Sequence, residues 1–306
     1  MSIEESSQKK RGPGRPPKKV LTVEYSHEGI VSEPKDKRNS VEIFYNCPYI
    51  MKLIFDYIKS IKSTTAHIYC NKESIHFITK KVVDVNKTDV EIKGNESMRY
   101  YCASDIWLGI NGGHVNKVLH GVDKSLYDRI SLSFSPENRE KFVITLFDDS
   151  IESSHCRYIT LSNLDVTNDI LTLPQTIKND IATDAYPISF TLPVRIFTKL
   201  VTTIADQKCP DFEFRRFHDQ PLMVYYEKQQ VIECVDTFGS DEKIEFKSTF
   251  NVPTMFICKL QTKNVKPVAS AIITDKVRIM CKQPDKVMFE LILDDAVTIH
   301  TILDNS

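Results

Sequence analysis

The sequence lacks the features that would make this a membrane or secreted protein. No segment approaches the roughly 18 consecutive apolar residues that a membrane-spanning helix needs. The first residues are charged and polar, whereas a secretory signal needs an apolar segment. We therefore expect an intracellular protein that has no membrane partner.

The sequence also lacks common motifs of catalysis. It has no phosphate loop GxxxxGK, no zinc-binding HExxH and no GxSxG nucleophile motif. The adjacent pairs Asp148-Asp149 and Asp294-Asp295 would suit a metal-dependent nuclease. However, adjacent strand residues point to opposite faces, and both pairs stand where a predicted strand ends. The sequence thus predicts neither an enzyme nor a cofactor, and a nuclease stays open as an alternative.

Metal-binding cysteine patterns are missing as well. The eight cysteines form no CxxC pair, and no histidine pair has zinc-finger spacing. Most of the cysteines lie within apolar runs such as "HIYCNK" and "VRIMCK". We therefore expect no metal site, and reduced thiols inside the core.

What the sequence does contain begins with a basic N-terminal segment. Six of the eleven residues of "KKRGPGRPPKK" (9–19) are basic, although the whole chain has a formal net charge of −1. Residues 1–39 carry few large apolar side chains, so we expect a disordered arm. "GRPPKK" resembles an AT-hook, which inserts into the minor groove of A·T-rich DNA, although Pro13 replaces the first arginine of that core. A nuclear import signal and a solvated tail are the alternatives. The arm residues predicted to contact DNA are Lys10, Arg11, Arg15, Lys18 and Lys19.

The rest of the chain reads as two copies of one unit. Each copy has the order strand, helix, strands, helix, strands, and we place the copies at residues 40–162 and 186–306. Matching points lie 147 residues apart (Val41 and Ile188) and 140 residues apart (Asn111 and Asn251). Few helices and many short strands predict an α+β fold with antiparallel sheets. Residues 163–185 form the connector between the two domains.

The four predicted helices lie in the segments 47–62, 110–122, 194–208 and 251–265. The third has a clear apolar stripe made by Phe197, Leu200, Val201 and Ile204. All four carry cations on the opposite face, which suggests that an acidic body collects its positive charge on one surface. Solvated helix faces are the alternative, and Asp56 is placed to pair with Lys52. The cations in and beside these helices are Lys52, Lys59, Lys62, His114, Lys117, Arg195, Lys199, Lys208, Lys259 and Lys263.

Three segments resemble proliferating cell nuclear antigen, the eukaryotic sliding clamp. They are "YYCASDIWLGINGGHVNKVLHGVDKSLYDRISLSF" (100–134), "YITLSNLDVTNDILTLP" (158–174) and "STFNVPTMFICKLQTKN" (248–264) followed by "VRIMCKQPDKVMFELIL" (277–293). The segments 11–19, 101–111 and 269–279 are similar to the divergent sliding clamps of large cytoplasmic DNA viruses of the African swine fever type. The resemblance is collinear over residues 40–306.

The resemblance implies a homotrimeric ring around double-stranded DNA. Two helices per domain would line the hole inside the ring, and the antiparallel sheets would lie outside. Lysine and arginine on the helices would attract phosphates without reading sequence. Chains would join head to tail by pairing edge strands, Cys156–Ser162 of one chain with Val231–Phe238 of the next, which also covers exposed sheet edges. The interface residues implied are Arg157, Ile159, Leu161, Val231, Glu233 and Val235.

The resemblance further implies that a DNA polymerase and other replication or repair proteins dock in a groove beside the connector, in a viral replication factory of the host cytoplasm. A clamp loader and a nuclear location stay open. The alternative for the groove is that its apolar residues merely pin the connector to the body. Positions that match the groove are Ile170, Leu171, Leu173, Pro174, Ile302 and Leu303.

Two other functions remain open at this stage. One is a monomeric processivity factor that binds DNA through a basic face without encircling it. The other is an architectural DNA-binding protein that uses the AT-hook-like arm. Only the ring would encircle DNA, and this property distinguishes it from both alternatives.

Overall fold

A computed structural model describes most of the chain beyond the basic arm. The described residues are 28–61, 65–80, 86–95, 98–111, 117–123, 126–162, 164, 166–217, 221–228, 232–237, 245–248, 255–271, 273–282, 286–293 and 295–304. Five arm residues predicted to contact DNA therefore lie outside the described residues, as do Lys62, His114, Val231 and Asp294.

The first half of the chain has one long described helix and ten strands. The helix is α1 (Pro48–Ser60), and η1 (Pro136–Asn138) is a single 3-10 turn. The strands are β1 (Gly29–Ile30), β2 (Val41–Tyr45), β3 (Thr65–Cys70), β4 (Ser74–Lys80), β5 (Lys87–Lys93), β6 (Met98–Cys102), β7 (Ile106–Asn111), β8 (Arg129–Phe134), β9 (Lys141–Asp148) and β10 (Ser153–Ser162).

The second half repeats this order after a helical connector. The connector holds α3 (Asn168–Leu171) and α4 (Leu173–Ala182), and α5 (Val194–Asp206) and α6 (Thr262–Ala271) follow. The strands are β11 (Ile188–Pro193), β12 (Asp211–Phe217), β13 (Met223–Lys228), β14 (Ile232–Thr237), β15 (Glu245–Ser248), β16 (Met255–Gln261), β17 (Lys276–Lys282), β18 (Lys286–Ile292) and β19 (Val297–Asp304).

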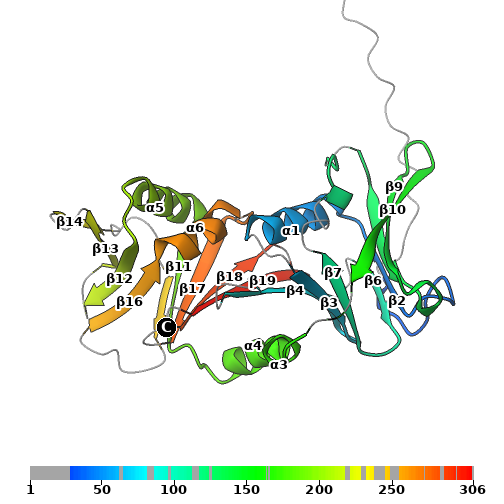
Figure 1. Cartoon of the computed structure of the whole chain (residues 1–306), viewed down its shortest axis with the longest axis horizontal. Coiled ribbons are helices and arrows are strands. Elements are labelled where there is room, and N and C mark those ends of the chain that lie inside the picture. Colours follow the sequence, from blue (N-terminus) through cyan, green and yellow to red (C-terminus); the bar gives the residue numbers. More distant parts are fainter. Residues whose placement is uncertain are drawn as a thin grey trace, which may run out of the picture.

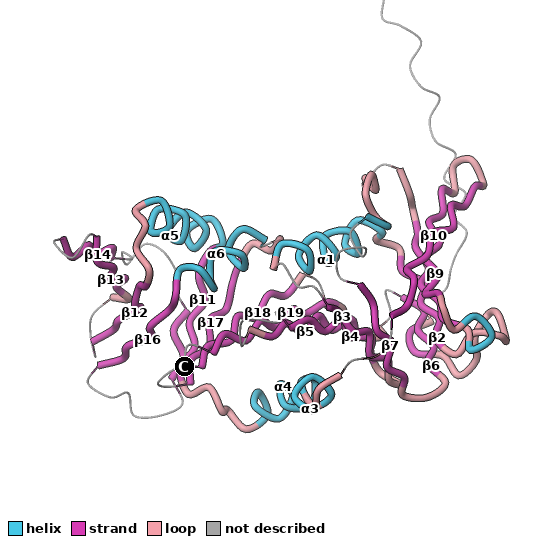
Figure 2. Tube along the Cα trace, in the orientation of Figure 1, coloured by secondary structure: helices cyan, strands magenta, loops and turns pink. Residues whose placement is uncertain are grey.

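The molecule is elongated, and its two faces differ (Figure 1). Fifteen strands form one continuous sheet, in the order β1-β6-β2-β8-β9-β10-β7-β3-β4-β5-β19-β18-β17-β11-β15. A separate sheet has the order β14-β13-β12-β16. Helices α5, α6 and α1 lie in a row over one face of the long sheet, and α3 and α4 lie against the other face (Figures 1 and 2). This arrangement gives the chain a helix face and a connector face.

Antiparallel pairing of β5 with β19 joins the two halves. The register runs from Ile92 opposite Val297 to Lys87 opposite Ile302. Above this seam, the buried hydroxyl of Tyr57 in α1 lies 2.7 Å from Thr301 Oγ1 in β19. One core cluster extends through both halves, so the repeat units share a single interior.

The helices that pack on the core follow their sequence signals closely. In α5, the predicted residues Phe197, Leu200, Val201 and Ile204 are all buried, because they recur at helical spacing on one side. In α1, Pro48 occupies the first turn, where a missing backbone N–H does no harm. Its buried stripe is Met51, Ile54, Phe55 and Ile58 together with Tyr57, whereas the neighbouring Ile50, Leu53 and Ile61 are only partly buried.

The fourth predicted helix, in segment 251–265, is wrong. Residues 255–261 form strand β16, and the helix α6 begins only at Thr262. The alternating burial of Phe256, Cys258 and Leu260 explains the difference, because a period of two is that of a strand. The second-half match for Asn111, which ends β7, is therefore Gln261, which ends β16. The corrected offset is 150 residues, close to the 147 found at the first strand.

The folded part of the chain begins earlier than the sequence predicts. Residues 28–39, predicted to belong to a disordered arm, have a defined path in which β1 pairs in parallel with β6. Arg99 explains the attachment: its Nε lies 2.8 Å from Glu28 Oε2, and its Nη1 lies 2.6 Å from Glu42 Oε2. Glu42, which is buried, also accepts a hydrogen bond from the backbone N–H of Lys35 at 2.6 Å. A buried charge that gains several partners in this way can organise a polar segment.

Candidate functional surfaces

The helix face carries more positive charge than the chain as a whole. Helices α1, α5 and α6 contain six cations and two carboxylates, a net charge of +4, whereas the whole chain has −1. Helix α6 contacts both α5 and α1, so the three helices form one surface. The exposed cations on this surface are Lys59, Arg195, Lys199, Lys263 and Lys266. Lys117, in the chain segment 117–123, is also exposed.

Two other predicted cations have local roles. Lys52 Nζ lies 2.5 Å from Asp56 Oδ2, one turn along α1, so the pairing considered from the sequence is present. Lys208 is exposed and takes a positive φ of 59°, the left-handed conformation that often ends a helix, just after α5.

Lys259 does not belong to the helix face, which corrects the sequence prediction. It lies on β16, and its side chain is 57% exposed and 3.1 Å from Asp211 Oδ2 on β12. Its neighbours Cys258 and Leu260 point into the core, so Lys259 points away from the core and from the helices packed on it. Lys266 of α6 is exposed and belongs to the helix face.

Edge strands stand at the two ends of the long molecule (Figure 1). Strand β10 pairs with β9 from Ser153 to Thr160, and on its other side it meets β7 only at Leu161 and Ser162. Strand β14 is the last strand of its sheet, and its neighbour in the described part of the chain is β13. Free N–H and C=O groups along such edges can pair with another strand.

The predicted interface residues on both edge strands lie at paired positions, and those on β10 differ in their side-chain contacts. On β10, Ile159 is buried in the core, Leu161 is half-buried against it, and Arg157 donates hydrogen bonds to the carbonyls of Val118 and His120. On β14, Glu233 and Val235 lie within the paired strand, opposite Glu227 and Tyr225 of β13. Any contact along β10 therefore relies mainly on backbone groups and on exposed side chains between these positions.

The connector folds into a helical plug on the connector face. We call residues 168–182 the connector plug: Thr172 joins α3 to α4, and its N–H donates to the carbonyl of Asn168 at 3.0 Å. Ile170, Leu173 and Ile177 of the plug are buried at 2 to 3% exposure. They fill what we call the outer groove, a cluster with Ile78, Tyr186, Met280, Met288 and Ile302.

Ion pairs hold the connector plug at both ends. Asp169 Oδ2 lies 2.9 Å from Lys80 Nζ and 2.8 Å from Lys87 Nζ, and these hydrogen-bonded lysines hold the pKa of Asp169 well below its usual range. Asp180 Oδ2 lies 3.2 Å from Lys286 Nζ at the other end. The plug is therefore attached by an apolar stripe and by surface charges around it.

The six residues predicted to bind partners differ in their exposure to solvent. Ile170, Leu173, Pro174, Ile302 and Leu303 are all buried, whereas Leu171 is 41% exposed. The alternative considered from the sequence, that the apolar connector residues pin the connector to the body, describes these contacts. Ile177 and Tyr186 take part as well and were missed, although Ile177 continues the helical spacing of Ile170 and Leu173.

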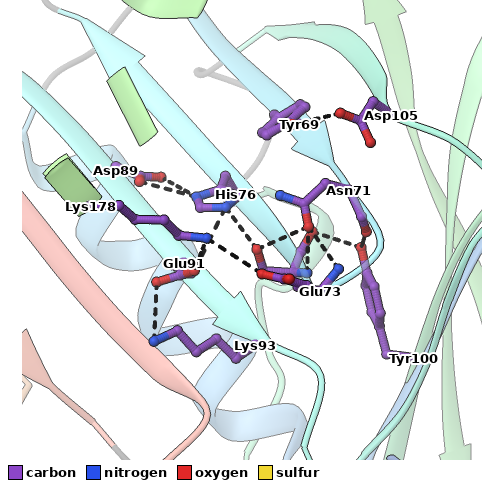
Figure 3. A network of polar contacts seen from close by, with 11 residues as sticks. Tyr69, Asn71, Glu73, His76, Asp89, Glu91, Lys93, Tyr100, Asp105 and Lys178 are labelled. Atoms are coloured by element: carbon purple, nitrogen blue, oxygen red, sulfur yellow. Dashed lines mark hydrogen bonds and ion pairs between the residues drawn. The ribbon is translucent and has the colours of Figure 1, made fainter. Parts of the chain in front are cut away.

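A polar network lies beside the plug (Figure 3). His76 Nδ1 is 3.0 Å from Asp89 Oδ1, and its Nε2 is 2.9 Å from Ser74 Oγ. This is the order of a hydrolase triad, but Ser74 is 0% exposed, so no substrate carbonyl can reach its Oγ in this conformation. Lys178 of the plug lies 3.5 Å from Glu91 in the same network. The network therefore connects the plug to the sheet.

The first of the two Asp pairs considered for a nuclease is engaged locally. Asp149 pairs with Arg129, and Asp148 accepts a hydrogen bond from the N–H of Ser150 at 2.9 Å. Within the described residues, no group of three or more His, Cys, Asp and Glu side chains is arranged to hold a metal ion. A search of the described helices likewise finds none with the length and apolar character to span a bilayer.

Comparison with known proteins confirms the resemblance seen in the sequence. No family model matches the chain. Uncharacterized proteins of African swine fever virus, from tick isolates of South Africa and Malawi, are 26% identical over 297 residues, which cover 97% of this chain and 98% of each viral protein. The proliferating cellular nuclear antigen of Entamoeba histolytica matches with a TM-score of 0.69 and 12% identity, over 88% of this chain and 99% of that one. The chain thus has the α+β sliding-clamp fold, and it is similar in sequence to viral proteins.

Proposed function

We propose that this chain is a DNA sliding clamp, a non-enzymatic processivity factor that closes as a homotrimer around duplex DNA during viral DNA replication. One observation carries the proposal: three adjacent helices with a net charge of +4 lie on one face of a chain whose net charge is −1. Exposed lysine and arginine on rigid helices attract phosphates of any sequence. This is what a protein needs in order to hold DNA without reading it.

The edge strands supply a way to close the ring. Strand β10 at one end and β14 at the other are separate surfaces of one chain, so their contact is head to tail. Repeating such a contact either closes a ring or builds an open filament. A closed ring also covers both edges, which would otherwise be sites of aggregation.

The remaining roles follow from the two faces. In the ring, the helix face would line the hole, and the connector face would be free for a DNA polymerase and other replication or repair proteins. The basic arm, which precedes β1 in the chain, would add an electrostatic tether to DNA. We place the clamp in a replication factory of the host cytoplasm. The alternative assignment of the arm is nuclear import.

Two measurements test the proposal. Light scattering over a protein dilution series should give a molar mass near three times 35.2 kDa. The protein should stay bound to closed circular DNA in high salt and leave when one cut makes the DNA linear. A monomer at all concentrations, or equal retention on circular and linear DNA, would refute encirclement and favour a factor that binds DNA through one face. Cleavage of the DNA that depends on a divalent metal would instead support a nuclease.

A further inference from the structure

The connector plug has the form of a bound amphipathic helix. Its buried residues Ile170, Leu173 and Ile177 stand at positions i, i+3 and i+7, and the residues between them are mostly exposed. A helix whose apolar stripe lies in an apolar groove is a common mode of peptide recognition. Here the groove and the helix belong to the same chain.

The plug is built to open easily. It contains Asn, Asp, Thr and Pro residues with low helix propensity, and neither α3 nor α4 has a side-chain hydrogen bond at its N-cap. A helical segment of this length is marginal without its packing surface. Its charged side chains are partly exposed, at 37% for Asp169, 40% for Lys178 and 18% for Asp180, and ion pairs that water reaches are weak. The plug therefore belongs to the low-stability part of the fold.

The sheet face under and beside the plug also has the composition of a surface that is at times exposed to water. It carries the buried ionisable side chains of His76, Asp89, Glu91, Glu290 and His300, which alternate with the core-facing residues of β4, β5, β18 and β19. Buried charges are costly, so a permanently covered face would more commonly be apolar. Although burial acts to raise the pKa of Glu290, the hydrogen bond from His300 and the charge of Arg278 lower it overall, which keeps this carboxylate ionised. Such groups regain water when the face is uncovered.

We propose that the connector plug is an internal competitor that leaves the outer groove by local opening, and that the groove then binds an amphipathic helix of a partner protein. The charges around the groove define that partner. Lys80 and Lys87 bind Asp169 just before the first apolar residue of the stripe, and Lys286 binds Asp180 three residues after the last. The partner helix therefore carries apolar residues at i, i+3 and i+7 with acidic residues before and after them. This inference rests on the proposed function, since it concerns how a client reaches the clamp.

Hydrogen exchange of the full chain tests the opening step. The variant Asp169→Asn/Asp180→Asn removes the end contacts and keeps the side-chain shapes. A matched variant, Asp184→Asn/Asp206→Asn, changes the net charge equally at exposed positions that have no ion pair among the described residues. We expect amides of α4 to exchange faster than those of β18 in the unmodified chain. We also expect about tenfold faster exchange in the first variant and no change in the second. Exchange of α4 as slow as that of β18 in all three proteins would refute local opening.

A peptide binding experiment tests the groove. The probe is a fluorescein-labelled peptide of residues 166–183, added to each full-length protein. We expect saturable binding that is about tenfold tighter to the Asp169→Asn/Asp180→Asn variant than to the matched variant, since 1.4 kcal/mol of destabilised plug corresponds to that factor. The same peptide with serine at 170, 173 and 177 should not bind. A variant that opens by hydrogen exchange but binds no peptide would overturn the proposal.

Trp107 offers an independent signal, because it is the one tryptophan of the chain and packs against the outer groove cluster. Its emission should shift when the peptide replaces the plug. These experiments need neither DNA nor the ring. If the peptide binds while the chain stays monomeric, the groove proposal stands and the clamp proposal falls. If the ring is retained on circular DNA but the peptide never binds, only the groove proposal falls.

Discussion

The charge on α5 provides the sharpest test of the helix face. Arg195 and Lys199 are four residues apart, both are exposed, and both lie opposite the buried stripe of that helix. Replacing both by glutamine removes two cations per chain and leaves the packing residues untouched. We expect DNA binding to weaken and to depend less on salt concentration, because fewer counterions are released from the phosphates.

The size of the effect follows from how many phosphates the variant no longer neutralises. Each neutralised phosphate contributes about 0.9 to the slope of log K against log salt. At 0.1 M salt this contribution raises the affinity about eightfold over its value at 1 M salt. If the trimer neutralises two fewer phosphates, the slope falls by about 1.8 and the affinity by about 60-fold at 0.1 M. If both α5 cations neutralise a phosphate in all three chains, the slope changes by about 5.

The assay is fluorescence anisotropy of a labelled duplex, titrated at several salt concentrations with the full chain, so that any contribution of the arm is the same in every protein. The control variant Lys276→Gln/Lys282→Gln removes two exposed cations from β17, on the side of that strand where Met280 meets the connector plug. Light scattering confirms that each variant keeps the oligomeric state of the unmodified protein. An unchanged slope for the α5 variant, or an equal loss in the control, would refute the assignment of DNA to the helix face.

Three further predictions concern single contacts. Tyr57→Phe removes the hydroxyl bonded to Thr301 across the seam of the two halves, and we expect a loss of about 0.5–1.5 kcal/mol in urea unfolding at fixed protein concentration. In Gly94→Ala the new methyl group would lie 2.7 Å from Ile30 Cγ1, so we expect faster amide exchange of residues 30 and 31, partly restored by Ile30→Ala. Because the folded state lowers the pKa of Asp169, its contribution is present above the unfolded value near 3.9 and is lost as the pH falls through the folded value. Tryptophan emission should therefore report loosening of the plug in strong acid, and Asp169→Asn should loosen the plug already at neutral pH and reduce this pH dependence.

Much of the fold could be predicted from local sequence patterns. Helix α5 and most strands follow directly from burial at periods of 3.6 and 2, because each packs one face on a common core. Matching Asn251 with Asn111 predicts a helix where strand β16 lies, although the alternation of β16 is visible in the sequence. The repeat indicated the correct order of elements but could not fix their limits.

The connector and its surroundings were harder to predict for a physical reason. Asn168, Thr172 and Pro174 suggest a loop when they are considered alone, and only contact with the sheet stabilises them as helix. Likewise, strand alternation places His76 and Asp89 on the outer face of the sheet, where side chains are expected to be exposed to solvent. Their burial depends on residues about 100 positions away in the plug, and such long-range cover leaves no local pattern.

The pairing of β5 with β19 also determines how the chain can be made. Ile92 meets Val297, so a growing chain must add 205 more residues before this edge of β5 finds its partner. Until then, the first half presents an unpaired strand to other nascent chains, which favours aggregation and slows folding. The two repeat units are thus not independent modules: their last step of folding is shared, and we expect them to unfold in a single cooperative transition.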